Sequence, residues 1–163
     1  MAEAAKALGM GGSITYKDKK YLLAPFNVDM IGMFEVWLEE QAWEKVERTK
    51  GRCSPDIYQD RMDSVTKQVT GQQFSYGSPI AAAAAMSIPG QKYILFLMMK
   101  FCPENEGVTE KLAHDIFEEK KTEALARMQS ASFDPNSEAP TTASGNPSVS
   151  PTSAPSSPES HGA

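Results

Sequence analysis

Two short runs near the beginning of the chain are rich in apolar residues and are separated by a charged stretch. Residues 14–16 (Ile-Thr-Tyr) and 21–23 (Tyr-Leu-Leu) have the β-branched and aromatic composition of strands, and residues 17–20 between them are charged. Pro25 ends the second run, because proline cannot donate to a strand ladder. The pattern predicts a short antiparallel β-hairpin, whose open edge is a candidate surface for self-association into a homo-oligomer.

The longest periodic segment follows directly and predicts one long helix with two apolar sides. Asn27 or Asp29 is suited to cap its N-terminus, and apolar residues then recur at spacings of three and four. The first apolar side consists of Met30, Phe34, Trp37, Leu38 and Gln41. The second apolar side consists of Met33, Val36 and Trp43. The side expected to face solvent consists of Glu39, Glu40, Glu44 and Glu47. Such a helix either lies centrally in the fold or offers one side to another molecule.

Two more helices are delimited by capping residues, proline and glycine. Ser54 is placed to cap a helix over residues 55–70, which Gly71 ends. An alanine-rich helix is predicted over residues 80–86, and Pro89-Gly90 is expected to break it. Its small side chains allow a neighbouring backbone to approach closely.

Residues 93–99 (Tyr-Ile-Leu-Phe-Leu-Met-Met) are apolar around the whole circumference of a helix. Together with the alanines they form an apolar block over residues 81–99, which raises the alternative of a membrane-associated hairpin. A spanning helix needs roughly 20 uninterrupted apolar residues. Ser87 and residues 89–92 divide this block into two shorter pieces. We therefore predict the central helix of a small core and no membrane partner.

A last helix is predicted to begin after Thr109 as its cap and to run toward Met128 or Gln129. With it, the expected fold class is mainly α. The prediction is a small helical domain of about five helices, with the short N-terminal β-hairpin, over residues 13–130.

The two ends of the chain have different compositions from this domain. Residues 1–12 end in Gly-Met-Gly-Gly and are expected to be a flexible leader. Residues 131–163 contain six prolines, nine serines and no lysine or arginine. Such a segment buries too little apolar surface to offset its chain entropy, so a disordered Pro/Ser-rich tail is predicted. A flexible tether and an inert solubilising end both suit this composition.

The distribution of charge argues against nucleic acid as a partner. The formal net charge is −5, and Asp134, Glu138 and Glu159 in the tail account for −3, which leaves −2 for the rest of the chain. A domain so close to neutral lacks the basic surface that binds phosphate backbones. We expect no nucleic acid partner.

Few residues have the spacing that catalysis or metal binding requires. Cys53 and Cys102 are far apart, no apolar leader precedes them, and they are expected to be reduced thiols in a cytosol-like compartment. His114 has no partner at a catalytic or ligand spacing. We predict no catalytic, cofactor-binding or metal-binding residue, and therefore no enzyme. The alternative is a small enzyme that uses Cys53, because Lys50 and Arg52 beside it would favour a thiolate.

A hairpin ending in residues 21–25 (Tyr-Leu-Leu-Ala-Pro) leads into a helix that contains residues 34–38 (Phe-Glu-Val-Trp-Leu). Later come Gly77-Ser78-Pro79 before the alanine-rich helix, the apolar helix at 93–99, a helix near 108–128 and a low-complexity end. This order of elements over residues 13–130 resembles the small tail assembly chaperones of tailed bacteriophages. The matching motifs are apolar patterns rather than catalytic residues.

The resemblance implies a non-enzymatic role in the host cytoplasm. Proteins of this family are thought to coat the long hydrophobic tape measure protein, to keep it soluble and to recruit tail tube subunits, and they leave before the virion is complete. The alternative within the same setting is a structural or adaptor subunit that stays in the phage particle.

A chaperone for helices needs exposed apolar surface that adapts to its client. The chain contains nine methionines, whose unbranched side chains adapt readily, although most of them are expected to fill the core. Tryptophan is favoured at the energetic centre of interfaces. We therefore predict that Met33, Val36 and Trp43, on the second side of the long helix, bind the partner.

Overall fold

The computed structural model describes residues 12–130, and every structural statement below concerns that part of the chain. The predicted hairpin is confirmed: β1 (Gly12–Tyr16) pairs with β2 (Lys19–Leu23) in antiparallel fashion, with Ile14 opposite Tyr21. The turn is two residues long rather than the predicted four. Lys17 and Asp18 both have positive φ, 49° and 62°, a geometry whose twist matches that of the flanking strands.

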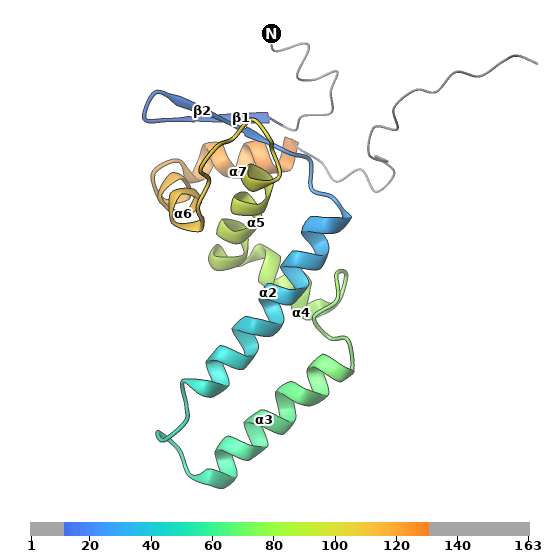
Figure 1. Ribbon diagram of the computed structural model, residues 1–163. Coiled ribbons are helices and arrows are strands. Elements are labelled where there is room, and N and C mark those ends of the chain that lie inside the picture. Colours follow the sequence, from blue (N-terminus) through green and yellow to red (C-terminus); the bar gives the residue numbers. More distant parts are fainter. Residues whose placement is uncertain (1–11, 131–163) are drawn as a thin grey trace, which may run out of the picture.

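The described chain is otherwise helical, which confirms a mainly α fold with an N-terminal hairpin. Its helices are α2 (Val28–Glu47), α3 (Pro55–Thr70), α4 (Pro79–Met86), α5 (Ile88–Lys100), α6 (Glu110–Glu119) and α7 (Lys121–Ser130). The hairpin, α5, α6 and α7 form a body, and α2 runs out of it to meet the antiparallel α3 (Figure 1). The predicted leader, apart from Gly12, and the predicted tail lie outside the described residues.

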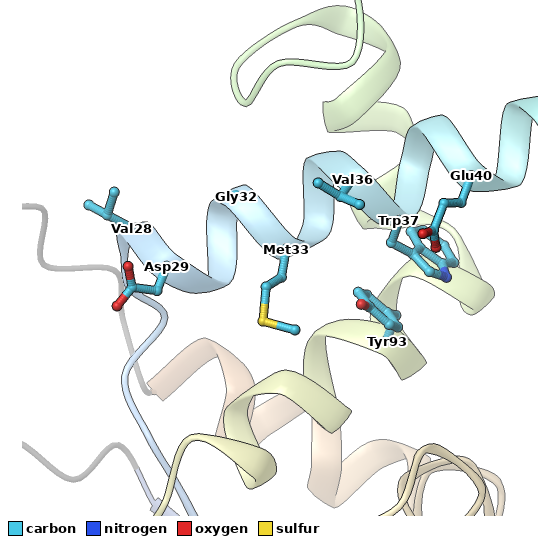
Figure 2. A pocket seen from close by; sticks show the side chains of 8 residues that line it. All are labelled: Val28, Asp29, Gly32, Met33, Val36, Trp37, Glu40 and Tyr93. Atoms are coloured by element: carbon cyan, nitrogen blue, oxygen red, sulfur yellow. The ribbon is translucent and has the colours of Figure 1, made fainter.

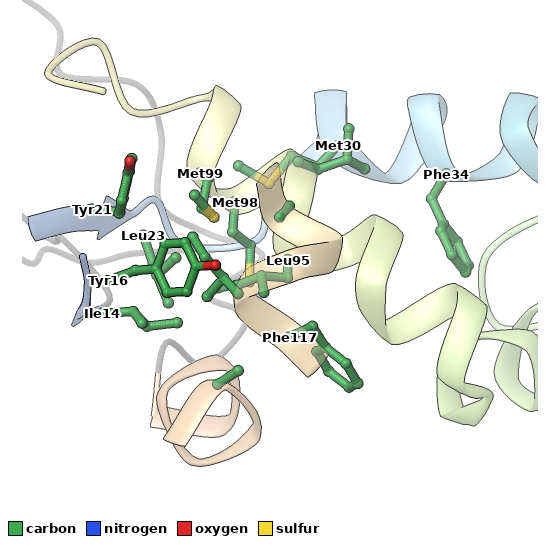
Figure 3. Close-up of a cluster of buried hydrophobic side chains, with 14 of the residues drawn as sticks. Ile14, Tyr16, Tyr21, Leu23, Met30, Phe34, Leu95, Met98, Met99 and Phe117 are labelled. Atoms are coloured by element: carbon green, nitrogen blue, oxygen red, sulfur yellow. The ribbon is translucent and has the colours of Figure 1, made fainter. Parts of the chain in front are cut away.

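The core lies where α2, α5 and α6 meet the inner face of the hairpin. Ile14 and Leu23 enter from the strands, and Phe117 enters from α6 (Figure 3). The predicted core helix is confirmed, because Leu95, Leu97, Met98 and Met99 of α5 are all buried. Met30 is buried beside them. Three of the seven methionines in the described residues are therefore buried, so the prediction that most of them fill the core is not confirmed there.

The N-terminus of α2 is fixed by one of its two predicted caps. The Asn27 side chain accepts a hydrogen bond of 3.0 Å from the backbone N–H of Met30. Asp29 instead lies in the first turn, where a negative charge suits the helix dipole. The first predicted side of α2 faces the core through Met30, Phe34 and Leu38.

The boundary between α4 and α5 lies at Ser87, and the prediction of a break at Pro89-Gly90 is wrong. The Ser87 hydroxyl caps α5 by accepting from the N–H of Gly90, 3.2 Å away, and Pro89 occupies the first turn, where its missing N–H costs nothing. The two helices meet at 83°. Gly90 is required at this joint, since a Cβ there would lie 2.0 Å from the carbonyl oxygen of Ala84.

The predicted last helix is divided into α6 and α7, because the chain bends at Lys120 with φ −126° and ψ 35°. In a straight helix Lys120 would share the buried face of Ile116 and Ala124, four residues away on either side. The bend leaves the Lys120 ammonium half-buried and 3.3 Å from Glu123. It also lets α6 pack on α5 while α7 packs on β1.

No single helix of the described chain is long and apolar enough to cross a membrane. The pair α4 and α5, which contains the predicted apolar block, passes that test of length and composition only when the two bent helices are taken together.

Candidate functional site

An apolar groove of about 580 Å³ runs along the N-terminal half of α2, and we call it the α2 groove. It is lined by Val28, Asp29, Gly32, Met33, Val36, Trp37, Glu40 and Tyr93 (Figure 2). All of these residues except Tyr93, which comes from the first half of α5, belong to α2. The groove is therefore essentially one helical face with an aromatic residue added across it.

Helical periodicity explains why these α2 residues share a face. Asp29, Gly32, Met33, Val36 and Glu40 follow one another at intervals of three, one, three and four residues. At about 100° of rotation per residue, all four later positions lie within about 60° of Asp29 around the helix axis, so the five residues share one face. Glycine and short or unbranched side chains occupy the middle of this stripe, and carboxylates occupy both ends (Figure 2).

One wall of the groove is a stack of aromatic rings that holds α2 against α5. The Trp37 and Tyr93 rings lie 4.7 Å apart between centroids at an interplanar angle of 11°, and Trp37 also stacks on Phe34 at 5.5 Å. Stacked pairs of this kind contribute about 0.5–1.5 kcal/mol beyond the area they bury. Trp37 and Tyr93 are only half-buried, so both rings remain accessible from outside.

The floor and rim leave apolar side chains in solvent. Val28 is 71% exposed and Val36 is 56% exposed, and both belong to α2. Met33 is half-buried, and its side chain points into the groove (Figure 2). Isolated exposed valines are common on protein surfaces, but two of them beside a methionine, a tryptophan and a tyrosine form a continuous apolar strip.

Negative charge lies at both ends of this strip, at Asp29 and Glu40. The α2 helix carries six acidic residues and one lysine. Burial raises the pKa of the Tyr93 phenol, and the nearby carboxylates of Glu110 and Glu40 raise it further, so both charges are felt at the aromatic wall. Asp29 and Glu40 form no ion pair with any residue in the described part of the chain.

The structure brings together two of the three predicted partner-binding residues. Met33 and Val36 both line the α2 groove. Trp43 lies two turns beyond Val36 on the same side of α2, is half-buried and is not part of the groove lining. Trp37 and Tyr93 were missed: Trp37 was placed on the core side of the helix, and a contact across to α5 leaves no signal in local periodicity.

A second apolar groove, of about 270 Å³, lies where α4, α5 and α7 approach the start of α2. Its lining consists of Phe26, Phe34, Tyr76, Ala85, Met86, Gln91, Ile94, Met98, Leu125, Met128 and Gln129. Met86 is the most exposed large apolar side chain of the described residues, at 77%. Phe34 lies between the two grooves, so one core side chain supports both.

The described region contains one histidine, His114, and two cysteines, Cys53 and Cys102. No group of three or more His, Cys, Asp or Glu side chains has metal-binding geometry there. His114 is half-buried, with Nε2 3.5 Å from the Glu110 carboxylate one turn earlier. The Cys53 thiol lies 3.4 Å from the Thr49 carbonyl oxygen. Burial raises the pKa of the Cys102 thiol to about 11, with a smaller contribution from Glu104.

Neither a protein-family model nor a curated protein nor a solved structure was found to match this chain.

Proposed function

We propose that this protein binds an amphipathic helix of another protein in the α2 groove and thereby keeps that segment from aggregating. In the setting that the resemblance implies, the client is a tape measure protein, and the role is that of a tail assembly chaperone. The observation that carries the proposal is the exposed apolar strip of Val28, Met33 and Val36 beside the half-buried rings of Trp37 and Tyr93.

The shape of the strip suits a helix better than an extended peptide. Peptides that add to a sheet need an unpaired strand edge beside their side-chain pockets, and the α2 groove contains only helical backbone. Its apolar residues recur at helical intervals, and a partner helix matches such a surface with its own residues at i, i+3, i+4 and i+7. Met33 adds a flexible side chain that adapts to different partners.

The rigidity of α2 also favours binding. The helix is capped at Asn27, and its opposite face is anchored in the core by Met30, Phe34 and Leu38. The groove is therefore formed before a partner arrives, and less conformational entropy is lost on association than with a mobile loop.

The first test places a charge in the centre of the strip. Val36→Asp should weaken capture of a client helix at least about tenfold, since a carboxylate would be desolvated against apolar side chains. Ile57→Asp is the matched control, because Ile57 is a similarly exposed aliphatic residue on α3, outside both grooves. The probe is a set of overlapping peptides from a tape measure protein, the client that the proposal names, titrated while tryptophan fluorescence is recorded.

Equal affinities for Val36→Asp and the unchanged protein, with circular dichroism showing both folded, would remove the α2 groove as the binding site. Trp43→Ala measures how far the interface extends along α2, and we expect it to weaken capture while the fold stays intact. Mass spectrometry of purified particles separates the chaperone from a structural or adaptor subunit, because only the subunit would remain in the particle.

A further inference from the structure

Each end of the α2 groove carries one acidic residue, Asp29 at one end and Glu40 at the other, and the distance between them sets the distance between matching charges on a partner. Asp29 and Glu40 are eleven residues apart on one helix, which is three turns plus about 20° of rotation and about 16 Å along the axis. Both side chains are exposed, and both lie at the groove (Figure 2). A helix lying along α2 would therefore meet a carboxylate near each end of its apolar stripe.

The centre of the groove contains a glycine for which the described chain offers no packing reason. A Cβ built on Gly32 would meet no atom within 4 Å, unlike one on Gly90, which would collide with backbone. A glycine inside a helix destabilises it by about 0.5–1 kcal/mol relative to alanine. Gly32 lies between Asp29 and Val36 on the groove face, so its missing side chain opens space for an approaching backbone.

From these two observations we infer that the partner is an amphipathic helix that packs closely over Gly32 and carries basic residues about eleven positions apart, opposite Asp29 and Glu40. The inference rests on the proposed function and specifies the chemistry of the client. Rim charges of this kind select the partner and its orientation more than they add affinity.

Two other occupants fit the charge less well. A second copy using the same face would place Asp29 and Glu40 of one α2 against those of another, and like charges across an interface are repulsive. Residues 131–163 contain no lysine or arginine to meet the two carboxylates. An external basic helix satisfies both ends of the groove.

The experiment uses the full-length protein and three synthetic helical peptides of about 16 residues, long enough to cover the groove. The peptides share one apolar stripe of leucine and alanine and differ only at two positions eleven residues apart, which are lysine, glutamine or glutamate. Titration is followed by the tryptophan fluorescence of the unsubstituted protein, whose two tryptophans, Trp37 and Trp43, both belong to α2. We expect the lysine peptide to bind about five- to tenfold more tightly than the glutamate peptide at low salt, with the difference shrinking at high salt.

Gly32→Ala provides a test in which stability and binding move in opposite directions. The substitution should raise the melting temperature and weaken binding of the lysine peptide roughly tenfold, because the added methyl group occupies the space of the partner backbone. Ser64→Ala, at an exposed position of α3, is the control for improved helix propensity without a change in the groove.

The outcomes separate the inference from the proposed function. Equal binding of all three peptides, abolished by Val36→Asp, would overturn the inference and leave the helix-binding function standing. Unchanged peptide affinity in Gly32→Ala would overturn close packing at this glycine. Binding of none of the peptides would overturn both the inference and the function. A dimer in sedimentation velocity that Val36→Asp dissociates would assign the groove to a second copy and likewise overturn the inference.

Discussion

At the scale of single residues, Asn105 connects parts of the chain that local patterns cannot relate. Its side-chain oxygen accepts from the N–H of Leu22, 2.9 Å away, and its amide nitrogen donates to the carbonyl oxygens of Leu22 and Met99 at 2.7 and 2.8 Å. The residue is buried, and it joins the hairpin to the end of α5. Nothing in the surrounding residues 102–108 singles it out.

Asn105→Ala should therefore be costly. Removal of the amide leaves three backbone groups, one buried and two partly buried, without these hydrogen bonds, and we expect the free energy of unfolding to fall by about 3 kcal/mol. Asn27→Ala is the comparison, since loss of an N-cap costs about 1 kcal/mol. Both are measured by urea denaturation with circular dichroism. Similar losses for the two variants would mean that the Asn105 hydrogen bonds do not hold the hairpin.

In the candidate site, too, residues on one helical face could be predicted from the sequence, whereas a contact between residues distant in the chain could not. Met33 and Val36 could be predicted because they occupy one helical face, and that face can be calculated from spacing alone. Trp37 and Tyr93 could not be paired in this way, since 56 positions separate them in the chain and only the packing of α2 on α5 brings their rings to 4.7 Å.

At the scale of elements, some helix boundaries are set by capping residues within the helix's own first turn, and others are set by the surfaces on which the helices pack. The caps of α2 and α3 were predictable, because Asn27 and Ser54 act within their own first turns. The break between α6 and α7 contains no proline or glycine, so the local sequence does not predict it. It arises because α6 packs on α5 and α7 packs on β1, two surfaces that one straight helix does not reach.

Two glycines, Gly90 at the joint between α4 and α5 and Gly32 in α2, give predictions of opposite sign for the change in stability. Gly90→Ala should destabilise the protein by about 2–3 kcal/mol, because the new Cβ would force the Ala84 backbone to move. Gly32→Ala should stabilise it by about 0.5–1 kcal/mol, because the helix loses a flexible residue and nothing obstructs the methyl group. Thermal unfolding measures both. A stabilised Gly90→Ala variant would contradict the close contact at this joint.

At the scale of the whole molecule, α3 lies beside the far half of α2 and away from the body (Figure 1). It packs mainly against α2 and has one buried residue, Val65, whereas α5 contacts α2, α4, α6 and β2 and has five buried residues. Local stability follows such differences in buried contact. The α2 groove lies in the half of α2 nearer the body, so α3 can open without disturbing it.

Native-state hydrogen exchange should reveal this division. We expect amides in the middle of α3 to exchange through local opening, at least about tenfold faster than amides in the middle of α5, which should need global unfolding. Saturating peptide should slow exchange in the N-terminal half of α2 and leave α3 little changed. Equal protection of α3 and α5 would show that the described chain unfolds as one unit.

The sequence by itself determined the local features of this protein: the strands of the hairpin, the caps of α2, α3 and α6, the apolar character of α5 and the second apolar side of α2. These depend on interactions within a few residues, which spacing and residue type express directly. Only the tertiary structure decided the two-residue turn, the break at Lys120 and the Trp37–Tyr93 wall, along with the three hydrogen bonds of Asn105. Most of these depend on partners distant in the chain, and periodicity carries no information about which distant surfaces meet.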